Sequence, residues 1–124
     1  MRARAAAWLK ACTTEGLDVL VYCTLRSMQE QAELYAQGRS KPGRIVTYAK
    51  PGQSAHNYGL ALDFCPLLAG KPVWSAASLL WKRPIALAED AGLESASRWT
   101  RFIEYPHLQV PDWRSYIQPP AEVA

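Results

Sequence analysis

Two histidines, each close to a carboxylate, are the residues of this sequence with the clearest potential for chemistry. His56 precedes Asp63 by seven residues in SAHNYGLALDF, and His107 follows Glu104 by three in EYPH. Two histidines and one aspartate can bind a tetrahedral zinc ion and leave the fourth position open for water, as catalytic zinc sites do. The sequence therefore predicts His56, Asp63 and His107 as zinc ligands.

Two alternatives to an open zinc site are compatible with these residues. Cys65 lies two residues after Asp63 and would share its face of a strand, so it could close the site as a fourth ligand. Two histidines and one carboxylate can also hold non-haem iron. An iron oxygenase, however, needs many more strands than this sequence predicts.

Glu104 and Arg26 are the other residues that could take part in a reaction. Glu104 is a free carboxylate near a predicted ligand, and it is the candidate for the base that takes a proton from an attacking water. Arg26 lies where a strand is expected to meet a helix N-terminus, which is an unfavourable place for a cation. That position favours a functional role for Arg26, such as binding an oxyanion or a substrate carboxylate, over that of an ordinary surface residue.

The hydrophobic pattern predicts the elements that position these residues. A helical stripe at positions 5, 8, 9 and 12 is followed by a strand at 18–24, a capped helix at 28–37 and a loop at 39–53 with a short strand at 44–47. Beyond it we expect a buried strand at 60–64 ended by Pro66, a helical segment at 75–91 with a kink at Pro84, and extended chain at 101–110. Helices mixed with a few short strands, without regular βαβ alternation, predict an α+β fold.

Length and composition limit the function classes. The 124 residues predict one domain over 1–124, and 49% hydrophobic with 20% charged residues is typical of a globular protein. A net charge of +3 is too small to predict nucleic-acid binding. The segment between Glu33 and Asp63 holds basic residues but no acidic ones, so it is either a solvated loop or a rim that attracts an anionic substrate. Its basic residues are Arg39, Lys41, Arg44 and Lys50.

The cysteines and the N-terminal segment indicate the cellular compartment in which the protein is made. Cys12, Cys23 and Cys65 form no CxxC pair, and we interpret them as small buried residues in a reducing compartment. The apolar run near the N-terminus stops at Lys10 and is too short for the hydrophobic region of a signal peptide. No run approaches the ~20 apolar residues of a transmembrane helix. We therefore expect a protein made without a signal peptide that does not insert into a membrane.

These segments resemble the family of zinc D,D-carboxypeptidases and L-alanyl-D-glutamate endopeptidases that includes VanX and VanY. SAHNYGLALDF resembles the Ser-x-His-x-x-Gly-x-Ala-x-Asp motif, and EYPHLQV resembles the second motif, in which an acidic residue precedes a histidine by three. RSMQEQAELYAQGR followed by IVTYAKPGQSAHNYGLALDF is similar to the phage endolysin and CwlK-like branch. The resemblance extends over about residues 24–110.

The resemblance implies a fold, a cofactor and roles for individual residues. It implies a single domain with a small antiparallel sheet flanked by helices, as in hedgehog and the D-Ala-D-Ala peptidases, and a Zn²⁺ cofactor. Small residues at Gly59 and Ala61 are expected where the backbone runs close to the metal. The implied roles are zinc ligand for His56, Asp63 and His107, catalytic base for Glu104, carbonyl polarisation for Arg26 and substrate binding for Ser54.

The resemblance also implies an activity and a setting. The expected function is cleavage of the peptidoglycan stem peptide at the L-Ala–D-Glu bond. A D-Ala-D-Ala carboxypeptidase or dipeptidase, or a non-catalytic zinc-stabilised wall-binding module, are the alternatives. The enzyme is expected to be a monomer made in the host cytoplasm that reaches the wall through a holin-type membrane lesion.

Overall fold

A computed structural model describes residues 1–117 of the chain. Three α-helices and five strands make up its regular structure, with short 3₁₀ turns between them. The helices and strands are α1 (Arg2–Thr14), β1 (Val19–Cys23), α2 (Met28–Ala36), β2 (Ala61–Leu68), β3 (Lys71–Pro72), α3 (Lys82–Asp90), β4 (Glu94–Ser95) and β5 (His107–Gln109). The 3₁₀ turns are η1 (Ala55–Tyr58), η2 (Leu79–Trp81), η3 (Ala96–Arg98) and η4 (Trp113–Tyr116).

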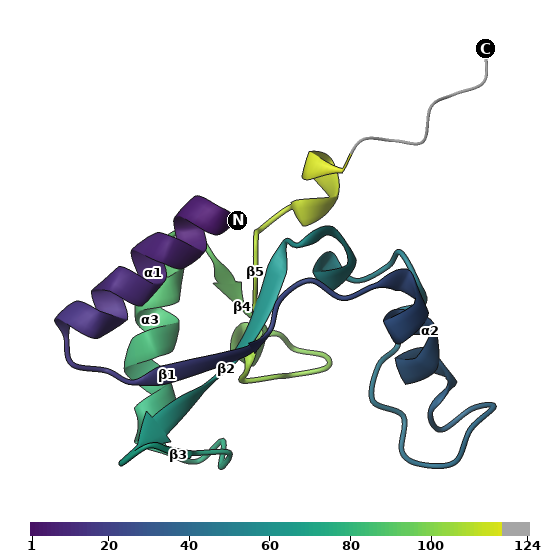
Figure 1. Cartoon of the computed structure of the whole chain (residues 1–124), viewed down its shortest axis with the longest axis horizontal. Helices are drawn as coiled ribbons and strands as arrows, with labels where there is room; N and C mark the ends of the chain where they lie inside the picture. Colours follow the sequence, from purple (N-terminus) through teal and green to yellow (C-terminus); the bar gives the residue numbers. More distant parts are fainter. Residues whose placement is uncertain (118–124) are drawn as a thin grey trace.

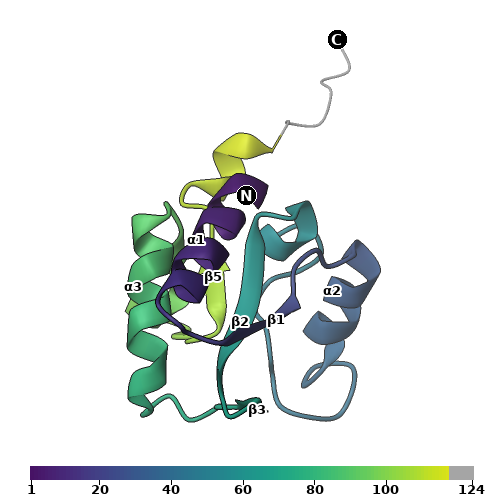
Figure 2. The same cartoon turned by 60° about the vertical axis from the view of Figure 1, so that its left-hand side comes forward.

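The strands form one antiparallel sheet with the order β1-β2-β5-β4, and β3 pairs with the far end of β2. Helices α1 and α3 lie together over one face of the sheet, whereas α2 and the loop after it lie on the other side (Figure 1, Figure 2). This arrangement confirms the predicted α+β fold with a small antiparallel sheet. None of the helices in residues 1–117 is long and apolar enough to cross a membrane.

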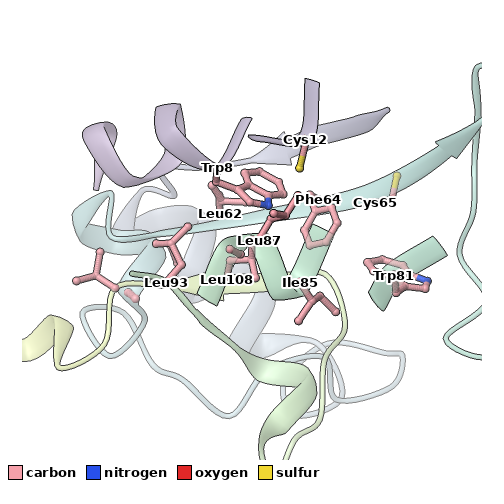
Figure 3. Close-up of a cluster of buried hydrophobic side chains, with 14 of the residues drawn as sticks. Trp8, Cys12, Leu62, Phe64, Cys65, Trp81, Ile85, Leu87, Leu93 and Leu108 are labelled. Atoms are coloured by element: carbon pink, nitrogen blue, oxygen red, sulfur yellow. The ribbon is translucent and has the colours of Figure 1, made fainter. Parts of the chain in front are cut away.

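The hydrophobic core fills the space between β2 and the helices α1 and α3 (Figure 3). The ring of Phe64 lies edge-on between two indoles, with centroid distances of 5.0 Å to Trp8 and 5.2 Å to Trp81. Trp8 is fully buried, and its indole nitrogen donates a 2.9 Å hydrogen bond to the carbonyl of Pro84. The core therefore fixes β2 against the helices without leaving that buried donor unpaired.

Three of the predicted elements are wrong in part. Residues 44–47 form no strand, because they pair with no strand in residues 1–117. Side chains bind two of their carbonyls instead: Gln37 donates to Arg44 O at 3.1 Å and Arg39 donates to Thr47 O at 3.1 Å. Residues 75–78 are not helical, and regular helix starts only with η2 and α3. Residues 101–106 are bent rather than extended, and Phe102 has a φ of 53° there.

Pro66 does not end the central strand, contrary to the prediction. Phe64 donates its backbone N–H towards β5, to Pro106 O, and Leu67 donates to Asp18 O next to β1. The nitrogen of Pro66 therefore faces the β5 side, beyond the last β5 pairing at Asp63. No donor is needed at that point, so proline is tolerated inside the strand.

Candidate metal centre and active site

His56, Asp63 and His107, which are far apart in the sequence, come together on the face of β2 opposite the core. Antiparallel pairing places Asp63 directly across from His107 on β5. The turn η1 immediately precedes β2 and brings His56 to the same place. Asp63 Oδ1 lies 3.3 Å from His56 Nε2 and 3.4 Å from His107 Nδ1, and the imidazole centroids are 5.0 Å apart.

His56 sits in a capped 3₁₀ turn rather than on a strand. The Ser54 hydroxyl accepts a hydrogen bond from His56 N at 3.3 Å, and Gly59 ends the turn with a φ of 67°. A Cβ atom on Gly59 would meet only a side-chain carbon of Leu25, at 4.0 Å. Gly59 is therefore suited to its position by its positive φ, and the protein atoms around it would leave space for a Cβ.

The environment of Asp63 suits a bound cation. Its Oδ1 atom is buried and has no hydrogen-bond partner among the described residues. Burial would raise the pKa of the Asp63 carboxyl, but the neighbouring imidazoles of His107 and His56 lower it well below its usual range. The carboxylate is thus ionised, with an unsatisfied oxygen next to two imidazole nitrogens, a combination that zinc binds well.

The cysteine near this group is Cys23, not Cys65. Cys23 faces Asp63 across the β1–β2 pairing, and a metal could be held by one atom each of Cys23, His56 and Asp63, which lie within 4.8 Å of one another. Cys65 is fully buried and outside this group. All three cysteines are free; Cys12 and Cys65 are buried as predicted, whereas Cys23 is partly exposed.

Arg26 follows β1 at the edge of the site and is held in place by three side chains. Its guanidinium donates to Gln31 Oε1 at 3.0 Å and to Cys23 Sγ at 3.6 Å, and it lies 3.9 Å from Asp63 Oδ2. Gln31 is completely buried and also donates to Ala49 O at 2.7 Å. Sequence patterns missed Gln31, because a glutamine on an amphipathic helix is normally read as a surface residue.

A cleft of about 1000 Å³ opens over these residues. Glu104 and Ser54 line it together with Arg26, His56, Asp63 and His107, so all six predicted site residues border one space. Although Glu104 is exposed, the surrounding protein partly excludes water and raises the pKa of its carboxyl; the charge of Asp63 acts in the same direction, against that of His107. A carboxyl with a raised pKa next to a candidate metal centre is suited to taking up and returning a proton.

The basic loop at 39–53 forms one wall of this cleft. Its aromatic residue Tyr48 packs on Phe102, which also lines the cleft, with ring centroids 4.4 Å apart. The guanidinium of Arg39 lies over the ring of Tyr35 at 3.7 Å and binds the Tyr35 and Thr47 carbonyls. Arg39 therefore holds the loop together, so it is less free to bind an anion than the sequence suggested.

Two family models match the chain, and both are described as D-alanyl-D-alanine carboxypeptidase. VanY matches residues 1–78 and Peptidase_M15_4 matches residues 47–110. The second match contains both histidines, Asp63 and Glu104. The two matches together extend from the first residue of the chain to Val110, the residue after β5.

Two curated relatives are similar in sequence. The chain is 41% identical over 108 residues to the peptidoglycan L-alanyl-D-glutamate endopeptidase CwlK of Bacillus subtilis, and the match covers 81% of this chain and 65% of CwlK. It is 36% identical over 98 residues to the L-alanyl-D-glutamate peptidase of a Listeria phage, covering 77% of this chain and 31% of that protein. The chain thus spans less than two thirds of the length of either relative.

Solved structures show the same fold. The L-Ala D-Glu endopeptidase ChiX of Serratia marcescens aligns with a TM-score of 0.67 at 22% identity, covering 92% of this chain and 79% of ChiX. The LD-carboxypeptidase LdcB aligns with a TM-score of 0.65 at 23% identity, covering 86% of this chain and 57% of LdcB. At this level of identity the comparison establishes the shared architecture.

Proposed function

The chain belongs to the VanY family of D-alanyl-D-alanine carboxypeptidases, and we propose that it is a zinc-dependent peptidase that cuts the stem peptide of peptidoglycan. The observation that carries this proposal is the convergence of His56 Nε2, His107 Nδ1 and the unsatisfied Asp63 Oδ1 in one cleft. These three residues are the proposed zinc ligands. Cys23 is left outside the set, because its sulfur lies 3.8 Å from His56 Nδ1, the nitrogen that faces away from Asp63.

The remaining residues have proposed roles that follow from their positions. A bound zinc ion would lower the pKa of a water molecule and polarise the scissile carbonyl. Glu104 is the proposed general base, which takes the proton of the attacking water and returns it to the leaving amine. Arg26, held by Gln31, places a cation beside Asp63 where it can attract the carbonyl oxygen or a substrate carboxylate.

Ser54 is proposed to act mainly through His56. Its hydroxyl accepts the backbone N–H of His56 and so fixes the turn that carries this ligand. Because the hydroxyl can still donate its own hydrogen bond and borders the cleft, Ser54 is also available to bind substrate.

The L-Ala–D-Glu bond is the proposed target. Both curated relatives are named for this specificity, whereas both family models are described as D-alanyl-D-alanine carboxypeptidase. The second candidate is therefore removal of a terminal D-Ala. The phage relative supports a role in wall lysis. We further propose that the domain is a monomer and that it reaches the wall from the host cytoplasm through a holin-type lesion.

Mass spectrometry of digested muropeptides distinguishes these activities. The proposed endopeptidase produces fragments with a new N-terminal D-Glu, whereas the carboxypeptidase releases D-Ala. Glu104→Gln is the matched control, because it keeps the size of the side chain and removes the proposed base. Wall binding without any cleavage by the zinc-loaded wild-type protein would contradict the proposal and indicate a binding module.

A further inference from the structure

A row of hydrogen-bonded side chains, buried at His107 and Gln109 and partly buried at Glu94, lies behind His107 on the side away from Asp63. His107 and Gln109 are two residues apart on β5 and are each 8% exposed. His107 Nε2 lies 2.8 Å from Gln109 Oε1, and Gln109 Nε2 donates to Glu94 Oε1 on β4. Strand pairing places Glu94 directly opposite Gln109, so the sheet itself sets this row.

The direction of these hydrogen bonds is fixed from the Glu94 end. An ionised carboxylate only accepts hydrogen bonds, so the amide nitrogen of Gln109 must point towards Glu94. The amide oxygen of Gln109 then faces His107 and accepts from Nε2, which must carry the hydrogen. When the ring is neutral, the lone pair is then on the other ring nitrogen, Nδ1, which lies 3.4 Å from Asp63 Oδ1.

We infer that Gln109 and Glu94 are positioning residues that hold His107 in the tautomer able to bind the metal through Nδ1. The inference rests on the metal site proposed above. Partners of this kind fix the orientation and tautomer of metal-bound histidines in many proteins, and losing them typically costs about 10- to 100-fold in metal affinity. Gln109 itself borders the cleft, whereas Glu94 does not, so the contact that links Glu94 to the site is its hydrogen bond with Gln109.

His56 is held in a different way. Its Nδ1 lies 2.8 Å from the backbone carbonyl of Thr24, which leaves Nε2 free to face Asp63. A backbone carbonyl is an acceptor that no side-chain substitution removes. His107 is therefore the ligand whose tautomer depends on side chains, and the one in which the effect can be tested.

Three variants distinguish the effect of hydrogen-bond direction on zinc affinity from the effect of side-chain packing. Gln109→Leu removes the acceptor, and we expect zinc affinity, measured by chelator competition, to fall about 10- to 100-fold. Glu94→Gln removes the carboxylate that fixes the orientation of the Gln109 amide, because two facing amides can pair in either orientation. In the double variant Glu94→Gln/Gln109→Glu the donor is at position 94 and the acceptor at 109, so a carboxylate again accepts from Nε2. Its zinc affinity should return to within about threefold of wild type.

The tautomer itself can be read without metal. Burial would lower the pKa of His107, but its hydrogen bonds to Asp63 and Gln109 raise it, so the nitrogen-15 shifts of the ring are read in the metal-free protein at a pH where the ring is neutral. They should show hydrogen on Nε2 in the wild type and the double variant, and a mixture of tautomers in Glu94→Gln. Glu89→Gln on α3, whose carboxylate pairs with exposed Arg98 among residues 1–117, is the control and should change neither measurement.

Wild-type zinc affinity in a folded Gln109→Leu protein would overturn the inference, as would a folded double variant that binds zinc no better than Gln109→Leu. An unmixed tautomer in Glu94→Gln would overturn the role of Glu94. A failure of the proposed function can be distinguished from a failure of this inference. A wild-type chain that binds no zinc would contradict the metal site, whereas the nitrogen-15 shifts would still test the hydrogen-bonded row.

Discussion

On one face of β2, Leu62 and Phe64 belong to the core shared with α1 and α3; on the other, Asp63 meets His56 and His107 in an open cleft. These residues are neighbours in sequence and point in opposite directions because side chains alternate along a strand. The helix-covered face consists of close-packed aromatic and aliphatic groups. The cleft face holds polar groups, one of which has an unsatisfied oxygen. Stability and chemistry should therefore respond to different substitutions.

The largest effect is expected from Glu104→Gln on the cleft face. Loss of a general base typically lowers the rate by about 10²–10⁴-fold, and Glu104 makes no core contact that the substitution would disturb. Activity on purified peptidoglycan should fall by that factor, while zinc content and melting temperature stay at wild-type values. Glu89→Gln is the control on the helix side. Retention of more than half of the wild-type activity in Glu104→Gln would remove Glu104 from its role.

Phe64→Ala tests the opposite face. Removing a buried aromatic ring typically costs about 3–5 kcal/mol of unfolding free energy, and Phe64 is fully buried against two indoles. Urea unfolding should show this loss, whereas the activity per folded molecule at low temperature should change little. If the activity of the folded fraction fell as strongly as in Glu104→Gln, the two faces would not be separable.

Arg26→Ala should have an intermediate effect on activity. Removing a group that stabilises a developing oxyanion typically costs about 10²–10³-fold in kcat, and Arg26 is the cation next to Asp63. Steady-state kinetics of Arg26→Ala and of the surface control Arg98→Ala would measure the difference. Equal activities of the two variants would show that Arg26 has only a structural role.

The smallest effect is expected in how the stability of the metal-free protein depends on pH. The folded-state pKa of Glu104 is raised because the cleft walls partly exclude water. At pH values between the unfolded pKa of about 4.3 and the folded pKa, the native state therefore binds more protons than the unfolded state. Stability from Glu104 is therefore full at low pH and is lost as pH rises through this window. Because Glu104 is exposed, we expect a small change. Urea unfolding of wild type and Glu104→Gln from pH 4 to 8 would measure it as the difference between the two proteins, and a wild type that gains stability relative to Glu104→Gln with rising pH would contradict the assignment.

The fold class and the convergence of the site residues could be predicted because they depend on local signals. Ser27 and Glu30 form the capping box expected at the start of α2. The spacing of His56 and Asp63 reflects a turn leading directly into a strand. The pairing of Asp63 with His107 then follows from the antiparallel sheet.

The neighbours of these residues could not be predicted because they depend on register and tertiary contacts. Cys23 faces Asp63 only because the β1–β2 register shifts between Val21 and Cys23. Gln109 and Glu94 meet through a two-residue strand, β4, which has no hydrophobic alternation to reveal it. The 44–47 segment has strand-like residues but no partner strand, so its composition misled the prediction.

The most direct test of the metal centre is the zinc content of purified wild type, His107→Ala and Cys23→Ser, measured by inductively coupled plasma mass spectrometry after zinc loading. If His56, Asp63 and His107 form the site, the wild type and Cys23→Ser will each hold about one zinc per chain, and His107→Ala will lose it. Zinc retained in His107→Ala but lost in Cys23→Ser would contradict this ligand set, and the metal would then be held by Cys23, His56 and Asp63.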